Sequence, residues 1–348
     1  MVNFTLLIRQ WFRQNKRLLP WRTTNNPYFI WLSEILLQQT RVEQGLPYYL
    51  DFTESYPTVS DLANASEQEV LRKWQGLGYY SRARNLHAAA KFIHVELNDE
   101  FPKTFKEIKK LKGVGDYTAA AISSFAFNLP HAVVDGNVFR VLSRYFNDET
   151  PIDSTQGKKV FSQYAQELID LEEPAEHNQA IMELGALVCT PKNPNCDACP
   201  LQESCLAFKA KTINVLPAKS KKTKVKKRYF HYLVDASNNY VIEKRDFKDI
   251  WQNMYQFPLY ETDFEYPRNE ILHNIKDSFN VEFLNQEPLH EVKHILSHQH
   301  IYTSFWLVSF HDLPENSIQV KSEEIDDYPL PRVIDRFLEE KGSYLNEA

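Results

Sequence analysis

Four cysteines confined to one short stretch constrain this chain more than any other feature. Cys189, Cys196, Cys199 and Cys205 are all the cysteines among 348 residues, and the gaps between them are six, two and five residues. A chance scatter would not cluster so tightly, and structural disulfides are unusual in an intracellular chain. Zinc sites more often pair two short cysteine knuckles across a long spacer, whereas one compact loop with uneven gaps suits a cluster held by four thiolates. The spacing in 189–205 therefore favours a [4Fe–4S] cluster over zinc.

The remaining composition is that of an ordinary globular protein. Hydrophobic residues make up 43% of the chain and charged residues 25%, which is enough apolar material for a sizeable core, and the length indicates two or three domains. No run approaches the roughly 20 apolar residues that span a bilayer. Arg9 also interrupts the stretch where a signal peptide would still be apolar. We expect a soluble monomer without membrane contact, cytoplasmic and associated with the nucleoid if the source is bacterial.

Helical periodicity dominates the first part of the chain. Apolar residues recur at three- and four-residue spacing, and Gly and Pro residues separate the segments. The predicted helices are 30–44, 66–74, 82–97, 104–111, 117–127, 138–145 and 160–168. The pattern predicts an all-α domain over residues 1–212.

Charge divides the chain into two dissimilar parts. Residues 1–228 hold 30 Lys and Arg against 24 Asp and Glu, whereas 229–348 hold 10 against 22, so the overall charge of −6 hides a basic part and an acidic part. At the end of the first part, 217–228 reads PAKSKKTKVKKR, a basic linker that is either a solvated tether or a segment that follows a phosphate backbone. We expect 213–228 to be the linker and 229–348 to be an α/β domain, with strands near 229–236, 240–244 and 301–310 and a helix at 269–279.

The segment LKGVGDYTA, which begins at Leu111, follows one predicted helix and opens another. Gly113 and Gly115 allow a tight turn and a close approach of the backbone, and the amides at the start of the next helix then face outward as anion donors. A glycine pair between helices is by itself usually a simple turn. In its context it predicts a helix-hairpin-helix over about 104–127 that holds DNA phosphate.

Two carboxylates occupy positions that suit acid chemistry. Glu34 lies inside WLSEILLQQT, an apolar helical stretch where an ionised side chain is costly to bury. Burial should raise the pKa of Glu34 and make it a proton donor near neutral pH. Asp135, in HAVVDGNV, comes after an apolar run and before a helix, so it is an N-cap whose free oxygen can also face a pocket.

Taken together, WLSEILLQQT, GVGDYTA, VDGNV, ELGALVC and the cysteine spacing resemble the adenine DNA glycosylase family, within the helix-hairpin-helix DNA-repair superfamily. The resemblance is close over residues 4–210 and looser beyond them. It implies an enzyme of base excision repair that removes adenine mispaired with 8-oxoguanine or guanine from double-stranded DNA. It also implies a [4Fe–4S] cofactor on the four cysteines.

The resemblance assigns roles that agree with the chemistry of the bond. Glu34 resembles the general acid that protonates adenine at N7, and Asp135 the carboxylate that stabilises the sugar cation, either by charge or through a transient covalent adduct. Tyr117 and Asn137 match assisting positions. Strand-cutting relatives carry at the position of Tyr117 a Lys that forms a Schiff base. A phenol cannot do so, which predicts a monofunctional glycosylase.

Further positions match residues that grip the DNA. The target base must leave the stack, and inserted side chains offset the unstacking penalty. Gln39, Thr40 and Tyr79 match DNA-contacting positions, with Gln39 and Tyr79 as wedges. Arg22 and Glu183 resemble residues that read the edges of the extruded adenine.

The C-terminal domain looks Nudix-like, but its sequence has no glutamate-rich Nudix helix, so we expect a reader of the lesion without pyrophosphatase activity. Ser297 and His298 resemble the motif that recognises the oxidised guanine, although Leu296 stands where an aromatic residue usually precedes them. Two alternatives stay open: an endonuclease III-like glycosylase and lyase for oxidised pyrimidines, and a non-catalytic iron–sulfur DNA-binding protein. A sliding clamp or other repair proteins as partners also stay open.

Overall fold

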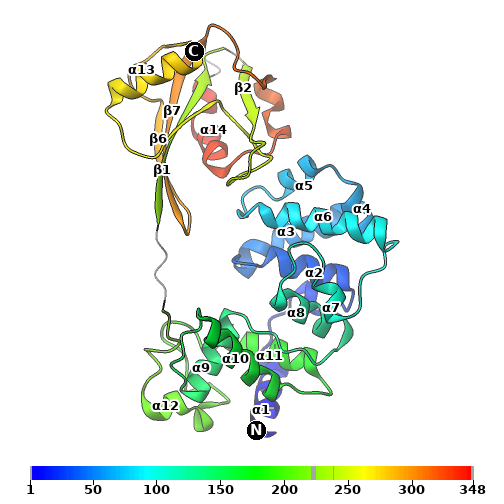
Figure 1. Cartoon of the computed structure of the whole chain (residues 1–348). Coiled ribbons are helices and arrows are strands. Elements are labelled where there is room, and N and C mark those ends of the chain that lie inside the picture. The colour runs from blue at the N-terminus through cyan, green and yellow to red at the C-terminus, as the bar shows by residue number, and fades with distance from the viewer. Residues whose placement is uncertain (1, 221–224, 238, 346–348) are drawn as a thin grey trace. The chain divides into compact units, whose positions relative to one another are not determined.

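A computed structural model describes residues 2–220, 225–237 and 239–345 (Figure 1). They form two compact units. The first unit comprises Met1–Asn64 and Asn85–Lys221, and the second comprises Ala65–Arg84 and Lys222–Ala348. The second unit thus joins a helical segment from the N-terminal half to the C-terminal domain. Among the described helices, none has the length and apolar character needed to cross a bilayer.

Helices build the first unit, which confirms the predicted all-α fold. They are α1 (Val2–Asn15), α2 (Pro27–Leu36), α3 (Val42–Ser55), α4 (Val59–Asn64), most of α6 (Ser81–Glu96), α7 (Phe105–Ile108), α8 (Asp116–Phe127), α9 (Gly136–Phe146), α10 (Thr155–Leu168), α11 (Pro174–Leu187) and α12 (Leu206–Ala210), with short 3-10 turns at Pro20–Arg22 and Gln202–Ser204. The prediction of one helix over 30–44 was wrong. Helix α2 ends at Leu36, and Gln39 has a left-handed backbone with φ of 56°, which no α-helix accommodates.

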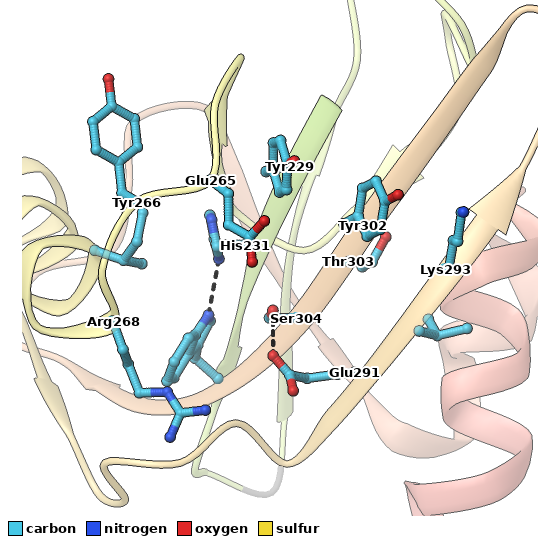
Figure 2. A pocket seen from close by; sticks show the side chains of 13 residues that line it. Tyr229, His231, Glu265, Tyr266, Arg268, Glu291, Lys293, Tyr302, Thr303 and Ser304 are labelled. Atoms are coloured by element: carbon cyan, nitrogen blue, oxygen red, sulfur yellow. Dashed lines mark hydrogen bonds between the residues drawn. The ribbon is translucent and has the colours of Figure 1, made fainter. Parts of the chain in front are cut away.

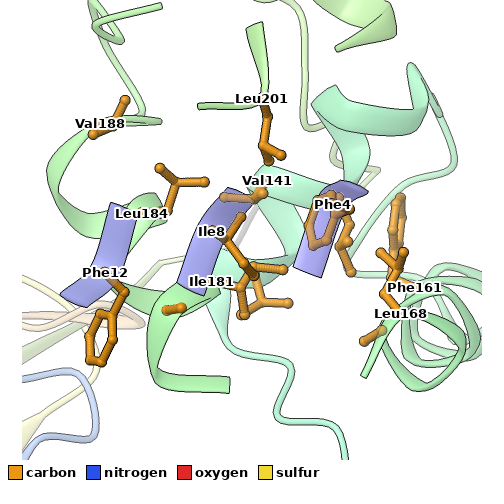
Figure 3. Close-up of a cluster of buried hydrophobic side chains, with 14 residues drawn as sticks. Phe4, Ile8, Phe12, Val141, Phe161, Leu168, Ile181, Leu184, Val188 and Leu201 are labelled. Atoms are coloured by element: carbon orange, nitrogen blue, oxygen red, sulfur yellow. The ribbon is translucent and has the colours of Figure 1, made fainter. Parts of the chain in front are cut away.

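One apolar cluster joins helices that are far apart in the sequence (Figure 3). Phe4, Ile8 and Phe12 of α1 lie in it with Val141 of α9 and Leu184 of α11. Burying each such side chain contributes about 1.5–3 kcal/mol. Because α9 begins beside Asp135 and α11 carries Glu183, this cluster fixes the spacing of two predicted site residues.

The turn between α7 and α8 has the predicted hairpin form. A capping box between Thr104 and Glu107 starts α7. Gly113 has φ of 81°, and a Cβ there would stand 2.7 Å from Cβ of Asn85, so only glycine fits. Gly115 precedes α8, and nothing lies within 4 Å of the place a Cβ would take. The backbone at Gly115 is therefore open to another molecule.

The second unit holds α5 (Glu67–Lys73) and an α/β domain, as predicted. Its strands are β1 (Lys226–Asp235), β2 (Asn239–Lys244), β3 (Tyr255–Gln256), β4 (Leu259–Thr262), β5 (Val281–Phe283), β6 (His290–Ile295), β7 (Gln299–Phe310) and β8 (Ser317–Lys321). One sheet has the order β4-β1-β7-β5, with β6 also paired to β7, and the other has the order β3-β2-β8. Strands β1 and β7 are parallel, with Lys226 opposite Gln299.

Helices cover both faces of the larger sheet (Figure 1). Trp306 packs with Ile271 and Ile275 of α13 (Arg268–Phe279). Phe305 points to the opposite face because side chains alternate along a strand, and it stacks on Phe337 of α14 (Arg332–Leu345) at 4.0 Å between ring centres.

The predicted linker is largely ordered where the structure describes it. Ser220 donates to Asp153 of the first unit, and the backbone N–H of Ile152 donates to Ala218. Strand β1 begins at Lys226, so the end of the basic segment is part of a sheet. Residues 221–224 of that segment lie outside the described residues.

Candidate active site and cysteine loop

The predicted catalytic side chains share one cavity of the first unit. It has a volume of about 640 Å³, within the range of small-molecule sites. Its lining comes from the segment before α2, from α2 and the turn after it, and from the starts of α8 and α9 and the middle of α11. The predicted residues that line it are Arg22, Glu34, Gln39, Thr40, Gly115, Tyr117, Asp135, Asn137 and Glu183.

Glu34 lies on α2 and is 8% exposed. The hydroxyl of Tyr117 donates to its Oε2 at 2.8 Å. Burial raises the pKa of Glu34 to about 7, with the nearby Asp135 acting in the same direction and the Tyr117 hydrogen bond acting against it. The predicted burial and pKa rise are confirmed, and the carboxyl can hold a proton near neutral pH.

Asp135 caps α9, as predicted. Its Oδ1 accepts from the backbone N–H of Val138 at 2.7 Å, and its Oδ2 accepts from Nδ2 of Asn137 at 2.8 Å. Burial raises the pKa of Asp135, while these hydrogen bonds act against that rise and favour the ionised form. The cavity therefore holds one carboxyl, Glu34, that accepts from a neutral hydroxyl and one, Asp135, that is anchored by two N–H donors.

Glu183 lies at another part of the cavity wall and is 1% exposed. Arg22 donates to both of its oxygens, at 2.9 and 2.7 Å, and Arg17 donates through Nε, Nη2 and its backbone N–H. Although burial acts to raise it, the hydrogen bonds from Arg22 and Arg17 lower the pKa of Glu183 to about 2. This carboxylate is ionised and fixed, with the two guanidiniums at the cavity.

The turn after α2 carries the two residues expected to contact DNA there. Gln39 is exposed and left-handed, a conformation that costs a non-glycine residue roughly 1–2 kcal/mol. Thr40 follows it and lines the cavity. Just before the turn, Gln38 donates to Thr118 of α8 at 3.2 Å and ties the two helices together. The strained residue is therefore held at the cavity mouth by its neighbour.

The cysteine loop lies at the other end of α9. Cys189, Cys196, Cys199 and Cys205 are unpaired and line one small pocket. Four thiols spaced around a common pocket fit a multi-iron cluster better than one zinc ion.

Two arginines of α9 contact this loop, and one of them links it to the cavity. Arg140 donates to the carbonyl of Cys189 at 2.6 Å and to Oδ1 of Asn137 at 2.8 Å. Since Asn137 in turn donates to Asp135, a continuous series of hydrogen bonds joins the first cysteine segment to the carboxylate of Asp135. Arg144, one turn further along the helix, donates to Sγ of Cys189 at 3.3 Å.

The predicted lesion-reading residues lie in the second unit, on the turn between β6 and β7. The hydroxyl of Tyr79 donates to Oγ of Ser297 at 3.2 Å, and Ser297 lies 3.3 Å from Nδ1 of His298. Tyr79 is 43% exposed and left-handed, with φ of 51°. All three residues and Leu296 line a cavity of about 460 Å³. The structure thus brings together one predicted wedge and both predicted reading residues.

The β1-β7-β6 face also has a cavity of about 430 Å³, which none of the predicted site residues lines (Figure 2). Nε1 of Trp306 donates to Nδ1 of His231 in its wall, and Ser304 donates to Glu291. The ring faces of Tyr302 are covered by Tyr229 on one side and by the ammonium of Lys293. These groups satisfy one another.

Sequence reasoning missed Arg17, Gln38, Arg140 and Arg144. Arg17 meets Glu183 across 166 positions of the sequence, and the two arginines of α9 bind mainly backbone carbonyls. Neither kind of partner leaves a local pattern. Two arginines four residues apart among the apolar residues of α9 are a signal that could have drawn attention.

Comparisons with known proteins follow the same division of the chain. Residues 32–169 match the model of the HhH-GPD superfamily base excision DNA repair protein, 189–205 the iron-sulfur binding domain of endonuclease III, and 229–340 the NUDIX domain. An adenine DNA glycosylase of Buchnera aphidicola subsp. Baizongia pistaciae is 35% identical over 88% of this chain and 86% of that protein. The human adenine DNA glycosylase is 44% identical over 57% of this chain and 38% of the human protein's length. The structure of a thermostable thymine-DNA glycosylase matches with a TM-score of 0.56 and 28% identity, over 60% of this chain and 95% of that one.

Proposed function

The chain belongs to the adenine DNA glycosylase family and is an iron–sulfur enzyme that hydrolyses N-glycosidic bonds, and we propose that its substrate is adenine paired with 8-oxoguanine or guanine in duplex DNA. The observation that carries this proposal is the pair Glu34 and Asp135 in one cavity. One carboxyl is poised to give a proton and the other to face a developing positive charge.

Excision of a purine needs both actions. Adenine leaves as a poor anion unless it is protonated, and the sugar becomes cationic as the bond breaks. Glu34, with its pKa raised to about 7, delivers the proton to N7. Asp135, held by Val138 N–H and Asn137, stabilises the cation. Tyr117 donates to Glu34 and keeps the carboxyl turned to one side of the base.

Binding would require adenine to leave the duplex. The cavity is large enough for a nucleoside, and Gln39 at its mouth takes the place of the extruded base. The fixed arrangement of Arg17, Arg22 and Glu183 offers donors at the cavity wall for the edges of adenine. The open backbone at Gly115 and the start of α8 supply donors for the strand's phosphate.

The opposite base would be read by the second unit. Tyr79 and Ser297 already share a hydrogen bond, so an aromatic wedge and a hydroxyl are positioned together. His298 adds a second polar side chain. Leu296 supplies an apolar contact where the family has an aromatic ring, so we expect its stacking contribution to be small.

The cysteine loop would serve DNA binding. The cluster, when bound, supplies a rigid, redox-capable centre around which the loop folds, with Lys192 exposed on it. The four thiols line a separate pocket from the two carboxylates. We therefore assign proton transfer and charge stabilisation to Glu34 and Asp135.

A monofunctional reaction distinguishes this proposal from an endonuclease III-like lyase. Tyr117, buried and bonded to Glu34, has no amine to attack the sugar, and burial raises its pKa well above the ordinary value. Reduction with borohydride during the reaction should not trap a protein–DNA adduct efficiently. Efficient trapping without prior heating would contradict the proposal.

The deciding experiment is single-turnover release of adenine opposite each of the four normal bases and 8-oxoguanine. We expect fast release opposite 8-oxoguanine and guanine and slow release opposite thymine, cytosine and adenine. Glu34→Gln should bind the lesion duplex but release little adenine. Glu96→Gln, which alters an exposed glutamate of α6, is the matched control. Equal rates for all opposite bases would overturn the substrate assignment.

A further inference from the structure

Arg144 is a buried cation in an unusual environment. It lies on α9, is 2% exposed, and is among the largest fully enclosed side chains of the described residues. Its guanidinium donates at 3.5 Å or less to one sulfur and to five carbonyl oxygens. The acceptors are Sγ and O of Cys189, and the carbonyls of Thr190, Pro191, Ile213 and Leu216.

The guanidinium has hydrogen-bond partners, and among the described residues none of them is a carboxylate. In the part of the chain that the structure describes, no Asp or Glu forms an ion pair with Arg144, whereas Arg9, Arg17, Arg22 and Arg228 each have at least one carboxylate partner. Carbonyl oxygens solvate a cation without neutralising it, and an uncompensated buried charge is costly. The site therefore calls for a negative group close to Arg144.

The bond to Cys189 identifies that group. Four thiolates outweigh the positive charge of a [4Fe–4S] core in its resting state, so the ligated cluster is an anion. We propose that Arg144 is the buried counter-cation of the cluster, and that its charge and its N–H···S bond to Cys189 raise the cluster's reduction potential. Adding an electron makes the cluster more negative, so a fixed neighbouring cation favours the reduced state.

Arg144 also ties two chain segments around the cluster site. Nη1 binds Thr190 at 2.8 Å, on the segment of the first ligand, while Nε binds Ile213 and Leu216 at 3.2 Å, beyond the last ligand. One planar group thus closes the loop at both ends, which a point charge cannot do equally well. Arg140 differs, because its guanidinium bonds to Asn137 and to carbonyls but not to sulfur.

The test measures the cluster without relying on catalysis. Holo-protein with Arg144→Met or Arg144→Lys is compared with wild type by direct electrochemistry of the DNA-free protein and by loss of visible absorbance in a chelator. Lys192→Met is the control, since it removes an exposed cation of the same loop. We expect Arg144→Met to lower the reduction potential and to speed cluster loss by roughly 10- to 100-fold. Arg144→Lys should lower the potential less, and Lys192→Met should change it least.

Faster cluster loss with a wild-type potential in the loaded Arg144→Met fraction would show a purely structural arginine and overturn the proposal. If Arg144→Met takes up no cluster, Arg144→Lys decides. The proposal requires that the reduction potential of Arg144→Lys lie below that of wild type. A wild-type potential together with wild-type retention of the cluster in Arg144→Lys would overturn the proposal. Neither readout depends on which base the enzyme excises.

Discussion

Glu34 and Glu183 lie in the wall of one cavity and are both almost fully buried, yet their pKa values move in opposite directions. The pKa of Glu34 rises to about 7, and that of Glu183 falls to about 2. Burial acts to raise both pKa values, so the hydrogen-bond partners decide the direction of each net shift. Tyr117 offers Glu34 one neutral hydroxyl, whereas two guanidiniums and a backbone N–H surround Glu183.

This contrast separates two tasks within one site. A carboxyl that can exchange a proton near pH 7 suits acid catalysis, while a permanently ionised one suits the fixing of neighbouring donors. The Glu34 end should therefore control the rate of bond cleavage. The Glu183 end should control the integrity of the cavity.

Apart from replacement of the proton donor Glu34 itself, the largest expected effect concerns Asp135, the carboxylate beside it. Asp135→Asn keeps the shape of the side chain but removes the charge that, in the proposed mechanism, faces the sugar. We expect single-turnover adenine release to fall by roughly 100- to 1,000-fold. Electrophoretic mobility shift with a lesion duplex should show binding within a few-fold of wild type, and release at the wild-type rate would contradict the assignment.

A change at the other end should act on stability first. Glu183→Gln leaves Arg17 and Arg22 without an anion, and we expect the free energy of unfolding at pH 7 to fall by about 3 kcal/mol. Chemical denaturation measures it, with Glu96→Gln as the surface control. If Glu183→Gln lowers the free energy of unfolding no more than Glu96→Gln does, the buried ion pairs make no net contribution to stability.

The two glutamates should also give opposite pH dependences of stability. An unfolded glutamate titrates near about 4.3. The folded-state pKa of Glu183 lies below that value, so its contribution is lost as pH falls from about 4.3 towards 2, and the difference between wild type and Glu183→Gln should narrow there. The folded-state pKa of Glu34 lies above it, so wild type should lose stability relative to Glu34→Gln as pH rises from about 4.3 through 7. Denaturation at several pH values checks both signs.

The smallest predicted effect comes from Tyr117→Phe. This change removes the hydrogen bond that favours ionised Glu34, so the pKa of Glu34 should rise further. One lost hydrogen bond contributes about 1 kcal/mol, so we expect a rate change within about 5-fold at pH 7. The pH at which the rate declines should move upward, and an unchanged or lower midpoint would contradict the proposed contact.

Local chemistry was enough to predict much of this site. A glutamate within an apolar helix predicted burial of Glu34, and an aspartate before a helix predicted the N-cap at Asp135. Gly113 was expected in a tight turn, and its φ of 81° explains why glycine is needed there. Each of these features depends on the nearest few residues.

What the sequence could not show depends on distant segments or on backbone acceptors. Apolar periodicity continues past Leu36, so it did not reveal that the chain turns at Gln39 before α3. The pairing of Arg17 with Glu183 is set by the packing of α1 against α11. In the sequence, Arg144 looks like an ordinary polar residue of an amphipathic helix. Only the structure shows that carbonyls of the cysteine loop surround it.

The most direct test of the catalytic account is the pH dependence of single-turnover adenine release from a duplex with 8-oxoguanine opposite adenine. Wild type and Glu96→Gln should show rates that decline as pH rises through about 7, where Glu34 loses its proton. Glu34→Gln should release adenine roughly 100- to 10,000-fold more slowly, without that decline. A Glu34→Gln enzyme with the wild-type rate and the wild-type pH profile would show that another group supplies the proton.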